Sequence, residues 1–181
     1  MYRDNTLIPT EAVRLAALGA LMEAERGYGD LASDVRYFVT HISGPSLDLL
    51  GTSLELLQYE GLVETIDVAE NGVARNRERD QESVLRITDA GRAIFEELML
   101  SNVRAPMNEV SNLVIALKIR FLHFLTPSAR AEQAETLVEM CDTEIVRLLE
   151  LKKRHGDGHL GAWLDMELTR LGKRLDWFRQ L

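Results

Sequence analysis

Residues Ser46–Gly91 have the sequence SLDLLGTSLELLQYEGLVETIDVAENGVARNRERDQESVLRITDAG, and their pattern indicates the fold most clearly. The helix-period apolar run of this stretch ends at Glu60-Gly61-Leu62, and the alternating residues Val63–Val68 that follow are typical of a half-buried strand. A charged tip containing glycine leads to a second strand at Val84–Ile87 and a capped helix start at Thr88. A helix, a two-stranded hairpin and a closing helix form the pattern of a winged helix-turn-helix, which is used mostly to place one helix in a DNA groove.

Helical patterns continue on both sides of this stretch. Thr126-Pro127 is the strongest start signal, because it combines an N-cap with proline at the first helical position. The helices are predicted at 10–25, from 30 to the turn at 43–45, and at 46–60, 88–100, 108–125, 127–155 and 160–181. The sequence therefore predicts a mainly α protein with a small two-stranded β-wing. Pro106 separates two predicted domains, a winged helix-turn-helix domain at 1–104 and a helical dimerisation domain at 105–181.

Charge is distributed unevenly between these domains. Residues 1–100 contain nine arginines, no lysine and eighteen acidic residues, which gives −9, whereas residues 101–181 carry +1. Because much of the affinity of proteins for DNA comes from neutralising phosphates, a lobe at −9 is on average repelled by the duplex. Any DNA contact must therefore rely on arginines that are locally concentrated.

Several functional classes are disfavoured by the sequence. The longest uninterrupted apolar run, Leu15–Met22, is too short to span a bilayer, and no secretory signal precedes it. The single Cys141 reads as a small buried hydrophobe and fits a reducing, cytoplasmic location. His155, Asp157 and His159 resemble a metal spacing, but no further ligand completes the set. No phosphate loop or nucleophile motif is present. We therefore expect no enzyme activity, no metal site, no cofactor and no membrane contact.

The predicted groove helix, 46–60, carries no Lys or Arg, so its polar side chains are the candidate base contacts. The arginines of the wing are the best candidates for contact with phosphate or the minor groove. Alternatively, these arginines pair with Glu78, Asp80 and Glu82 and merely solvate the hairpin. The predicted DNA-binding residues are Ser46, Thr52, Ser53, Gln58, Tyr59, Arg75, Arg77 and Arg79.

The last two predicted helices are long and fold back as a hairpin, with apolar residues beyond a single stripe. This pattern favours a dimerisation lobe, and the alternative is a monomeric bundle packed on the winged domain. The predicted dimer-interface residues are Leu117, Phe121, Phe124, Leu137, Leu148, Leu164, Leu168, Leu171, Leu175 and Phe178.

The chain resembles the PadR family of bacterial transcriptional regulators over nearly its whole length. The residues that carry the resemblance are Gly27-Tyr28-Gly29, Ser46, the Leu57 to Val63 ending, Ile87-Thr88-Asp89-Ala90-Gly91-Arg92, Leu117–Leu125, Leu125-Thr126-Pro127 and Leu175-Asp176-Trp177. The resemblance implies a homodimer held by its C-terminal helices that reads a palindromic operator and usually represses transcription. Some members release DNA when a small aromatic compound binds. The chain departs from the family in the groove helix, where Gly51 and Glu55-Leu56 replace the usual tyrosine and basic pair.

The final helix carries a candidate pocket for such an aromatic effector. Trp163 and Trp177 offer indoles for stacking, and Arg170 and Arg174 lie between them to pair with a carboxylate. The alternative is that both tryptophans belong to an interface core with arginines at its rim.

Two functions are compatible with these observations. The first is a homodimeric transcriptional regulator, a repressor, that binds duplex DNA through residues 46–60 and the wing. The second is a winged-helix adaptor that has lost DNA binding and uses the acidic face of the same helix to hold a basic protein partner.

Overall fold

A computed structural model of the chain describes residues 7–44, 50–66, 84–103 and 108–181, with only the backbone described at 50–53. The described part contains seven α-helices, one 3₁₀ turn and three short strands. It forms two compact units, Ile8–Met99 and a second that comprises Leu100–Leu181 together with the N-terminal Leu7.

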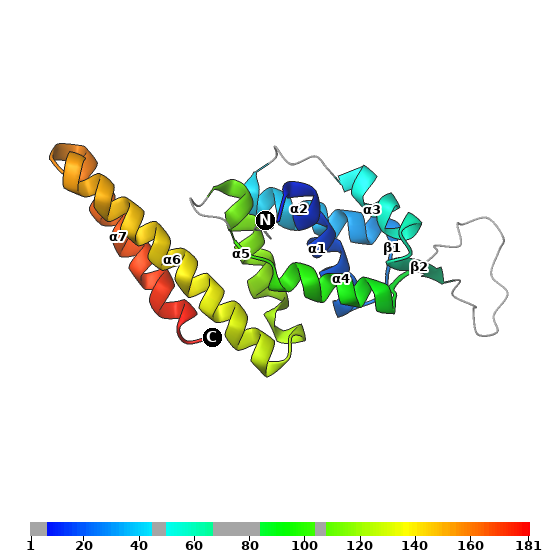
Figure 1. Cartoon of the computed structure of the whole chain (residues 1–181). Helices are drawn as coiled ribbons and strands as arrows, with labels where there is room; N and C mark the ends of the chain where they lie inside the picture. Colours follow the sequence, from blue (N-terminus) through cyan, green and yellow to red (C-terminus); the bar gives the residue numbers. More distant parts are fainter. Residues whose placement is uncertain (1–6, 45–49, 67–83, 104–107) are drawn as a thin grey trace, which may run out of the picture. The chain divides into compact units, whose positions relative to one another are not determined.

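The first unit is built around α1 (Pro9–Glu23), whose residues are buried on almost every side. Its small side chains, Ala12, Ala16, Ala17 and Ala20, allow close approach of neighbouring elements. α1 contacts α2 (Tyr28–Ser43), α3 (Leu50–Tyr59) and β3, while α4 (Asp89–Leu100) follows the sheet (Figure 1). α1 is thus the central core helix of the winged unit.

The sheet of the winged unit has three antiparallel strands in the order β1-β3-β2. β1 (Arg26–Gly27) and β2 (Val63–Ile66) flank β3 (Val84–Ile87). Leu85 and Ile87 of β3 are 3% exposed and face the core, so Arg86 faces the other side. There it lies opposite Glu64 in the register and forms ion pairs with Glu64 at 3.7 Å and Glu25 at 2.7 Å.

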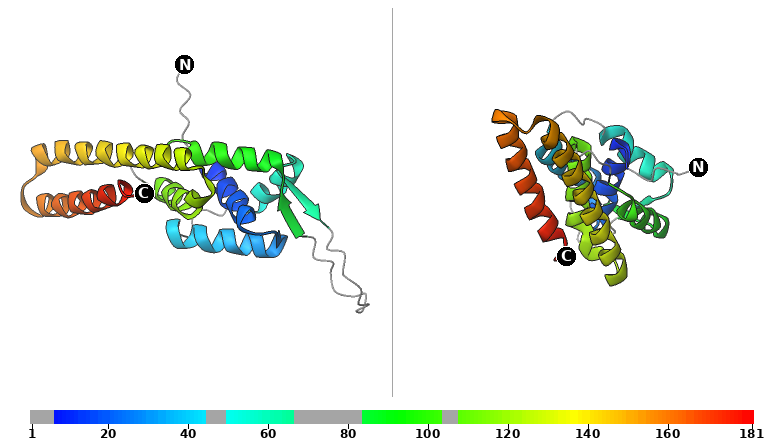
Figure 2. Two further views of the ribbon diagram at one scale, coloured as in Figure 1. Left: turned by 90° about the horizontal axis from the view of Figure 1, so that it is seen from below. Right: turned by 60° about the vertical axis from the view of Figure 1, so that its left-hand side comes forward.

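The second unit contains α5 (Glu109–Phe121), a 3₁₀ turn (Leu122–Phe124), α6 (Pro127–His155) and α7 (Gly158–Phe178). Asn108 caps α5 by accepting from the backbone N–H of Ser111 at 2.8 Å, and the hydroxyl of Thr126 caps α6. α6 and α7 run antiparallel as a hairpin (Figure 2), with Leu148, Leu164 and Leu171 forming a cluster in its core.

The predicted fold class is confirmed, since the chain is mainly helical with a small antiparallel sheet. The sheet has three strands where two were predicted, because Arg26 and Gly27 pair with Leu85 and Val84. Helix α2 begins at Tyr28 and not at Asp30, and α7 begins at Gly158 and not at Leu160. The predicted domain boundary at 104/105 lies outside the described residues. Within the described ranges, no helix combines the length and apolar character needed to cross a membrane.

Candidate nucleic-acid interface

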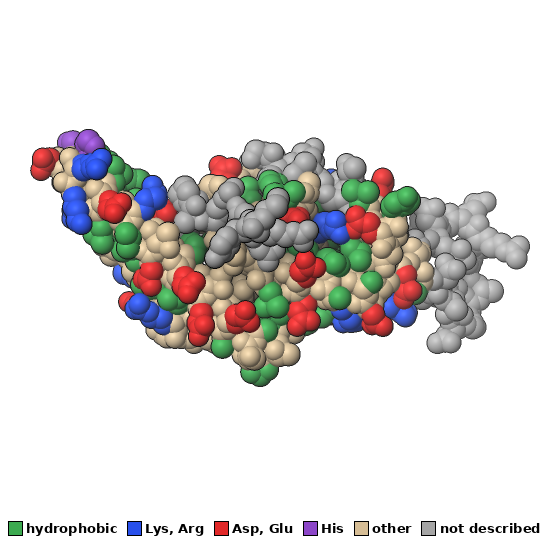
Figure 3. All heavy atoms as spheres, viewed as in Figure 1, with side chains coloured by type: hydrophobic (Ala, Val, Ile, Leu, Met, Phe, Trp, Pro, Cys, Tyr) green, Lys and Arg blue, Asp and Glu red, His purple; other side chains and the backbone are tan. Residues whose placement is uncertain are grey.

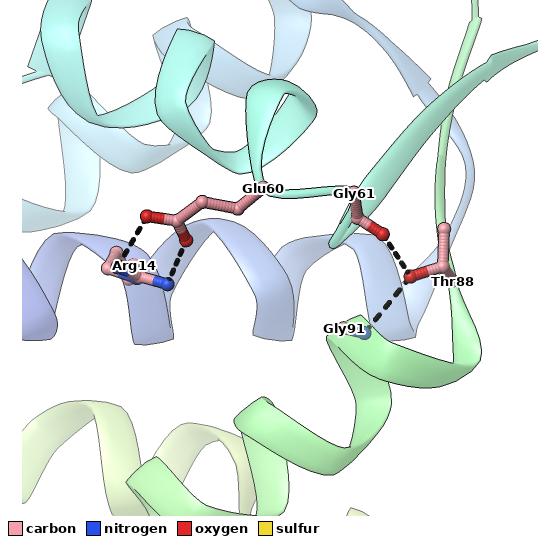
Figure 4. A network of polar contacts seen from close by, with 5 residues as sticks. All are labelled: Arg14, Glu60, Gly61, Thr88 and Gly91. Carbon is pink, nitrogen blue, oxygen red and sulfur yellow. Dashed lines mark hydrogen bonds and ion pairs between the residues drawn. The ribbon is translucent and has the colours of Figure 1, made fainter.

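The end of α3 and the start of α4 are joined by one hydroxyl group. The hydroxyl of Thr88 donates to the backbone oxygen of Gly61 at 2.8 Å and accepts from the N–H of Gly91 at 3.0 Å (Figure 4). Gly61 has φ +71°, a conformation that favours glycine. A Cβ on Gly91 would lie 2.1 Å from the oxygen of Leu62, so glycine allows α4 to pack against this turn. Thr88 therefore caps α4 and fixes the end of α3 where the hairpin begins.

A second contact anchors the same end of α3 to the core helix. The guanidinium of Arg14 on α1 forms an ion pair with the carboxylate of Glu60, using both of its terminal nitrogens (Figure 4). Two parallel bonds from an arginine fix geometry better than a single lysine contact does. The carboxylate of the exposed Glu60 is therefore already paired with a residue of its own chain, and the sequence pattern alone did not indicate this role.

Most of the predicted DNA-binding side chains lie outside the described part of the chain. Ser46 and the wing arginines Arg75, Arg77 and Arg79 lie outside the described residues. The backbone of Thr52 and Ser53 forms part of α3, but the side chains of these two residues also lie outside the described part. These six remain predictions.

The other two predicted contacts lie at the C-terminal end of α3. The amide nitrogen of Gln58 donates to the hydroxyl of Thr65 on β2 at 3.0 Å, which orients this exposed side chain toward the hairpin. Tyr59 is 90% exposed, while Leu54 and Leu57 of the same helix are buried. α3 thus presents a phenol and an amide to solvent and keeps its leucine stripe in the core.

Most arginines in the described part of the winged unit form ion pairs with carboxylates. Arg26 lies 3.0 Å from Glu23, and both Arg14 and Arg86 are also paired with carboxylates. The described face of this unit in Figure 3 shows Asp and Glu interspersed with Arg, without a continuous area of Lys and Arg. Phosphate contact through this face would therefore require cations that are not already paired.

Two such arginines were missed by the sequence analysis. Arg36 on α2 is exposed, and Arg92 on α4 is exposed and donates to the sulfur of Met22 at 3.1 Å. Among the described residues neither forms an ion pair with a carboxylate. For Arg36 the sequence contained the signal, because no acidic residue lies three or four positions away on its helix.

In the helical unit, most of the predicted interface residues are buried within a single chain. Phe124 and Leu168 are only partly buried, and the other eight, from Leu117 to Phe178, are at most 7% exposed. They therefore form the core of one copy. Large apolar side chains that remain exposed on the hairpin include Val146 (56%), Trp163 (48%) and Met166 (57%).

The four predicted ligand-pocket residues are spread along α7. Trp163 and Trp177 are about half exposed and lie fourteen positions apart, roughly 21 Å along the helix axis. One small aromatic molecule cannot touch both indoles of one chain. Arg170 forms an ion pair with Glu167 at 2.6 Å. Arg174 lies one turn before Trp177 on the same helix.

Lys118 is the most unusual titratable group of this unit. Its side chain is fully buried in α5, and its Nζ donates to the backbone oxygen of Ser101 at 2.7 Å. Burial lowers the pKa of Lys118 from 10.5 to about 7, because the charged form loses its hydration. Lys118 thus fastens the segment after α4 onto α5 at a cost that depends on pH.

Two other titratable side chains of this unit with shifted pKa values, Cys141 and Arg147, have structural roles. Cys141 is fully buried, and burial raises the pKa of its thiol, as expected for an unreactive core cysteine. The hydrogen bonds with Glu144 raise the pKa of Arg147. In the part of the chain that the structure describes, no group of three or more His, Cys, Asp or Glu is placed to hold a metal ion.

Comparison with solved structures returns distant likenesses over most of the chain. smu.1604c from Streptococcus mutans UA159 is 15% identical with a TM-score of 0.41, covering 92% of this chain and 96% of that one. PadR of Bacillus subtilis in complex with operator DNA is 15% identical, with a TM-score of 0.38 and coverage of 92% and 95%. PadR of Bacillus subtilis with p-coumaric acid is 16% identical, with a TM-score of 0.39 and coverage of 97% and 96%. At these scores the likenesses carry no conclusion about function.

Comparison by sequence is more decisive. No protein with a curated description matches the chain. The family model described as "Putative AphA-like transcriptional regulator" matches residues 2–181, which is nearly the whole sequence. The chain therefore belongs to the AphA-like family of transcriptional regulators.

Proposed function

We propose that the protein is a homodimeric DNA-binding transcriptional repressor of the PadR type, which contacts a palindromic operator through α3 and the wing. The observation that carries this proposal is the family match over residues 2–181, which spans both units. The local geometry supports it, because Thr88 and Glu60 fix the junction of α3, the hairpin and α4. A fixed junction keeps the position and orientation of a groove helix constant relative to a wing, as sequence-specific DNA binding requires.

In this proposal the phosphate contacts come from arginines that are not paired with a carboxylate of the same chain. Arg36 and Arg92 meet this condition among the described residues of the winged unit, and Arg75, Arg77 and Arg79 are added from the sequence prediction. Gln58 and Tyr59 are the described candidates for contact with bases or sugars, because both are polar and exposed at the end of α3.

The dimer is assigned to the α6–α7 hairpin. The exposed apolar residues Val146, Trp163 and Met166 support this assignment, since the leucines predicted for the interface already fill the core of one chain. A symmetric pair would bring the same patch of each copy together.

We also propose that a small aromatic effector binds at Trp177 and Arg174. These two residues are three positions apart on α7, so an indole face and a cation lie on the same side of the helix. Titration of p-coumaric acid, followed by Trp fluorescence in the protein and in Trp177→Phe, tests this part. Quenching that Trp177→Phe abolishes is the expected result, and equal quenching in Trp163→Phe and Trp177→Phe would contradict the assignment.

A second function is favoured by one observation, the pairing of Arg14, Arg26 and Arg86 with carboxylates in a unit of net negative charge. A winged-helix adaptor that binds a basic protein would show this charge pattern. In that case α3 would offer Glu55 and Tyr59, both exposed, to the partner.

Binding of the full-length protein to random duplex DNA at increasing salt concentration separates the two functions. A DNA-binding regulator binds at low salt, and its affinity falls steeply as salt rises, because binding to the phosphates releases counterions from the DNA. Arg75→Ala, Arg77→Ala and Arg79→Ala should each flatten the slope of log K against log salt by roughly one for each phosphate that is no longer neutralised. Arg154→Ala, on the exposed end of α6, is the matched control and should leave the slope unchanged. Absence of binding at the lowest salt would favour the adaptor.

A further inference from the structure

The α6–α7 hairpin contains a hollow where the first half of α6 meets the last turn of α7. Its volume is about 510 Å³, within the range of pockets that hold small organic ligands. Ala134 and Val138 of α6 and Phe178 of α7 provide apolar lining. Phe178 is only 2% exposed, so accessible apolar surface comes instead from side chains such as the half-buried Ala134 and Val138. This surface suits an apolar molecular body.

Two carboxylates on one side of the hollow set its charge. Glu135 and Glu139 both line it, both are exposed, and neither forms an ion pair among the described residues. They are four positions apart on α6, so their like charges lie one above the other and repel. A cation bound beside them would relieve this repulsion.

Arg179 also lines the hollow, and a carboxylate lies close to its positive charge. The guanidinium of Arg179 lies 3.6 Å from a carboxylate oxygen of Asp176, one turn earlier on α7. This nearby carboxylate offsets part of the charge of Arg179. The hollow therefore favours a positive ligand over a negative one.

We propose that this hollow binds a small organic cation with an apolar body, whose charge lies against Glu135 and Glu139 and whose body lies on Ala134 and Val138. This site differs from the predicted site at Trp177 and Arg174, which would take a carboxylate. It also does not depend on whether the protein binds DNA.

Tetraphenylphosphonium and tetraphenylborate test the proposal directly, because they have nearly the same shape and opposite charge. Isothermal titration calorimetry of the full-length protein should show saturable binding of one tetraphenylphosphonium per chain. Tetraphenylborate should bind at least tenfold more weakly. Equal binding of the two ions, or no saturable binding of the phosphonium, would overturn the proposal.

Substitutions locate the site. The double variant Glu135→Gln/Glu139→Gln should weaken phosphonium binding at least tenfold, whereas Glu132→Gln should change it less than twofold. Glu132 is an exposed carboxylate of the same helix that does not line the hollow. Ala134→Leu, which fills the hollow, should also abolish binding while leaving the circular dichroism spectrum unchanged. Phosphonium affinity that is unaltered in the double variant would overturn the assignment, and since no DNA is present, that failure would leave the proposed regulatory function standing.

Discussion

The hydroxyl of Thr88 donates a 2.8 Å hydrogen bond to the backbone oxygen of Gly61, twenty-seven residues earlier in the chain. The same hydroxyl accepts from the first turn of α4 at Gly91. One side chain thus satisfies a backbone acceptor at the end of α3 and a backbone donor at the start of α4, which would otherwise depend on water.

Replacing Thr88 with Val keeps the shape of the side chain and removes both bonds. We expect a loss of about 1–2 kcal/mol in the free energy of unfolding, the usual effect of losing an N-cap. Urea unfolding followed by circular dichroism measures it. Thr88→Ser retains the hydroxyl and should lose less than half as much. Equal losses in both variants would show that the hydroxyl is not responsible.

Gly91→Ala tests the close packing of α4 against the turn at Leu62. The added Cβ would lie 2.1 Å from the oxygen of Leu62 and 2.7 Å from a side-chain carbon of Ile87, so the backbone must shift. We expect destabilisation of about 2–3 kcal/mol, as for other overpacked sites. Gly172→Ala is the control, since nothing lies within 4 Å of a Cβ there, and it should stabilise α7 by about 0.5–1 kcal/mol. A melting temperature for Gly91→Ala equal to that of the parent would contradict this close packing.

Burial of Lys118 makes stability depend on pH. Its folded pKa is about 7 and its ordinary value is 10.5, so between these values the unfolded chain binds more protons than the folded one. Stability should therefore rise with pH across this window, by at most about 1.4 kcal/mol per pH unit from this group. Unfolding free energies measured from pH 7 to pH 10 should rise less steeply in Lys118→Met than in the parent. Lys173→Met, at an exposed position of α7, should follow the parent. Parallel curves for Lys118→Met and the parent would show that Lys118 does not titrate in this window.

Oligomeric state tests the assignment of the dimer to the hairpin. Val146→Asp and Met166→Asp place a charge on exposed apolar positions, so we expect monomers of unchanged helix content in sedimentation experiments. Ile42→Asp, at an exposed apolar position of α2, should remain dimeric. Leu171→Asp is a different test, because Leu171 is 2% exposed in the hairpin core and its substitution should unfold the hairpin. Dimers that persist in both surface variants would contradict the assignment.

Local signals in the sequence were sufficient for most of the fold. Thr126-Pro127 predicted the start of α6, and the strand at Val84–Ile87 was predicted with its observed bounds. β1 was missed because its two residues, Arg26 and Gly27, show no alternation, and their pairing with β3 depends on residues nearly sixty positions later. Such non-local pairing cannot be inferred from periodicity alone.

Partners of side chains were harder to predict than helices. The leucines of α7 are apolar at helical spacing, and this pattern is the same whether they face α6 of the same chain or a second copy. The partnership of Arg14 with Glu60 spans forty-six positions and has no sequence signature. By contrast, the absence of an acidic residue three or four positions from Arg36 was visible in the sequence and would have identified Arg36 as a candidate for phosphate contact.

Sequence-specific DNA binding is tested by selecting DNA from a random duplex pool with the protein and sequencing the bound fraction. A homodimer with one α3 per copy should enrich a two-fold symmetric motif whose half-sites are centred about 10 base pairs, or a multiple of this, apart. The enrichment should disappear for a variant carrying Arg36→Ala, Arg75→Ala, Arg77→Ala and Arg79→Ala together. A bound fraction without any enriched motif, or no recovered DNA at low salt, would show that this protein is not a sequence-specific DNA-binding regulator.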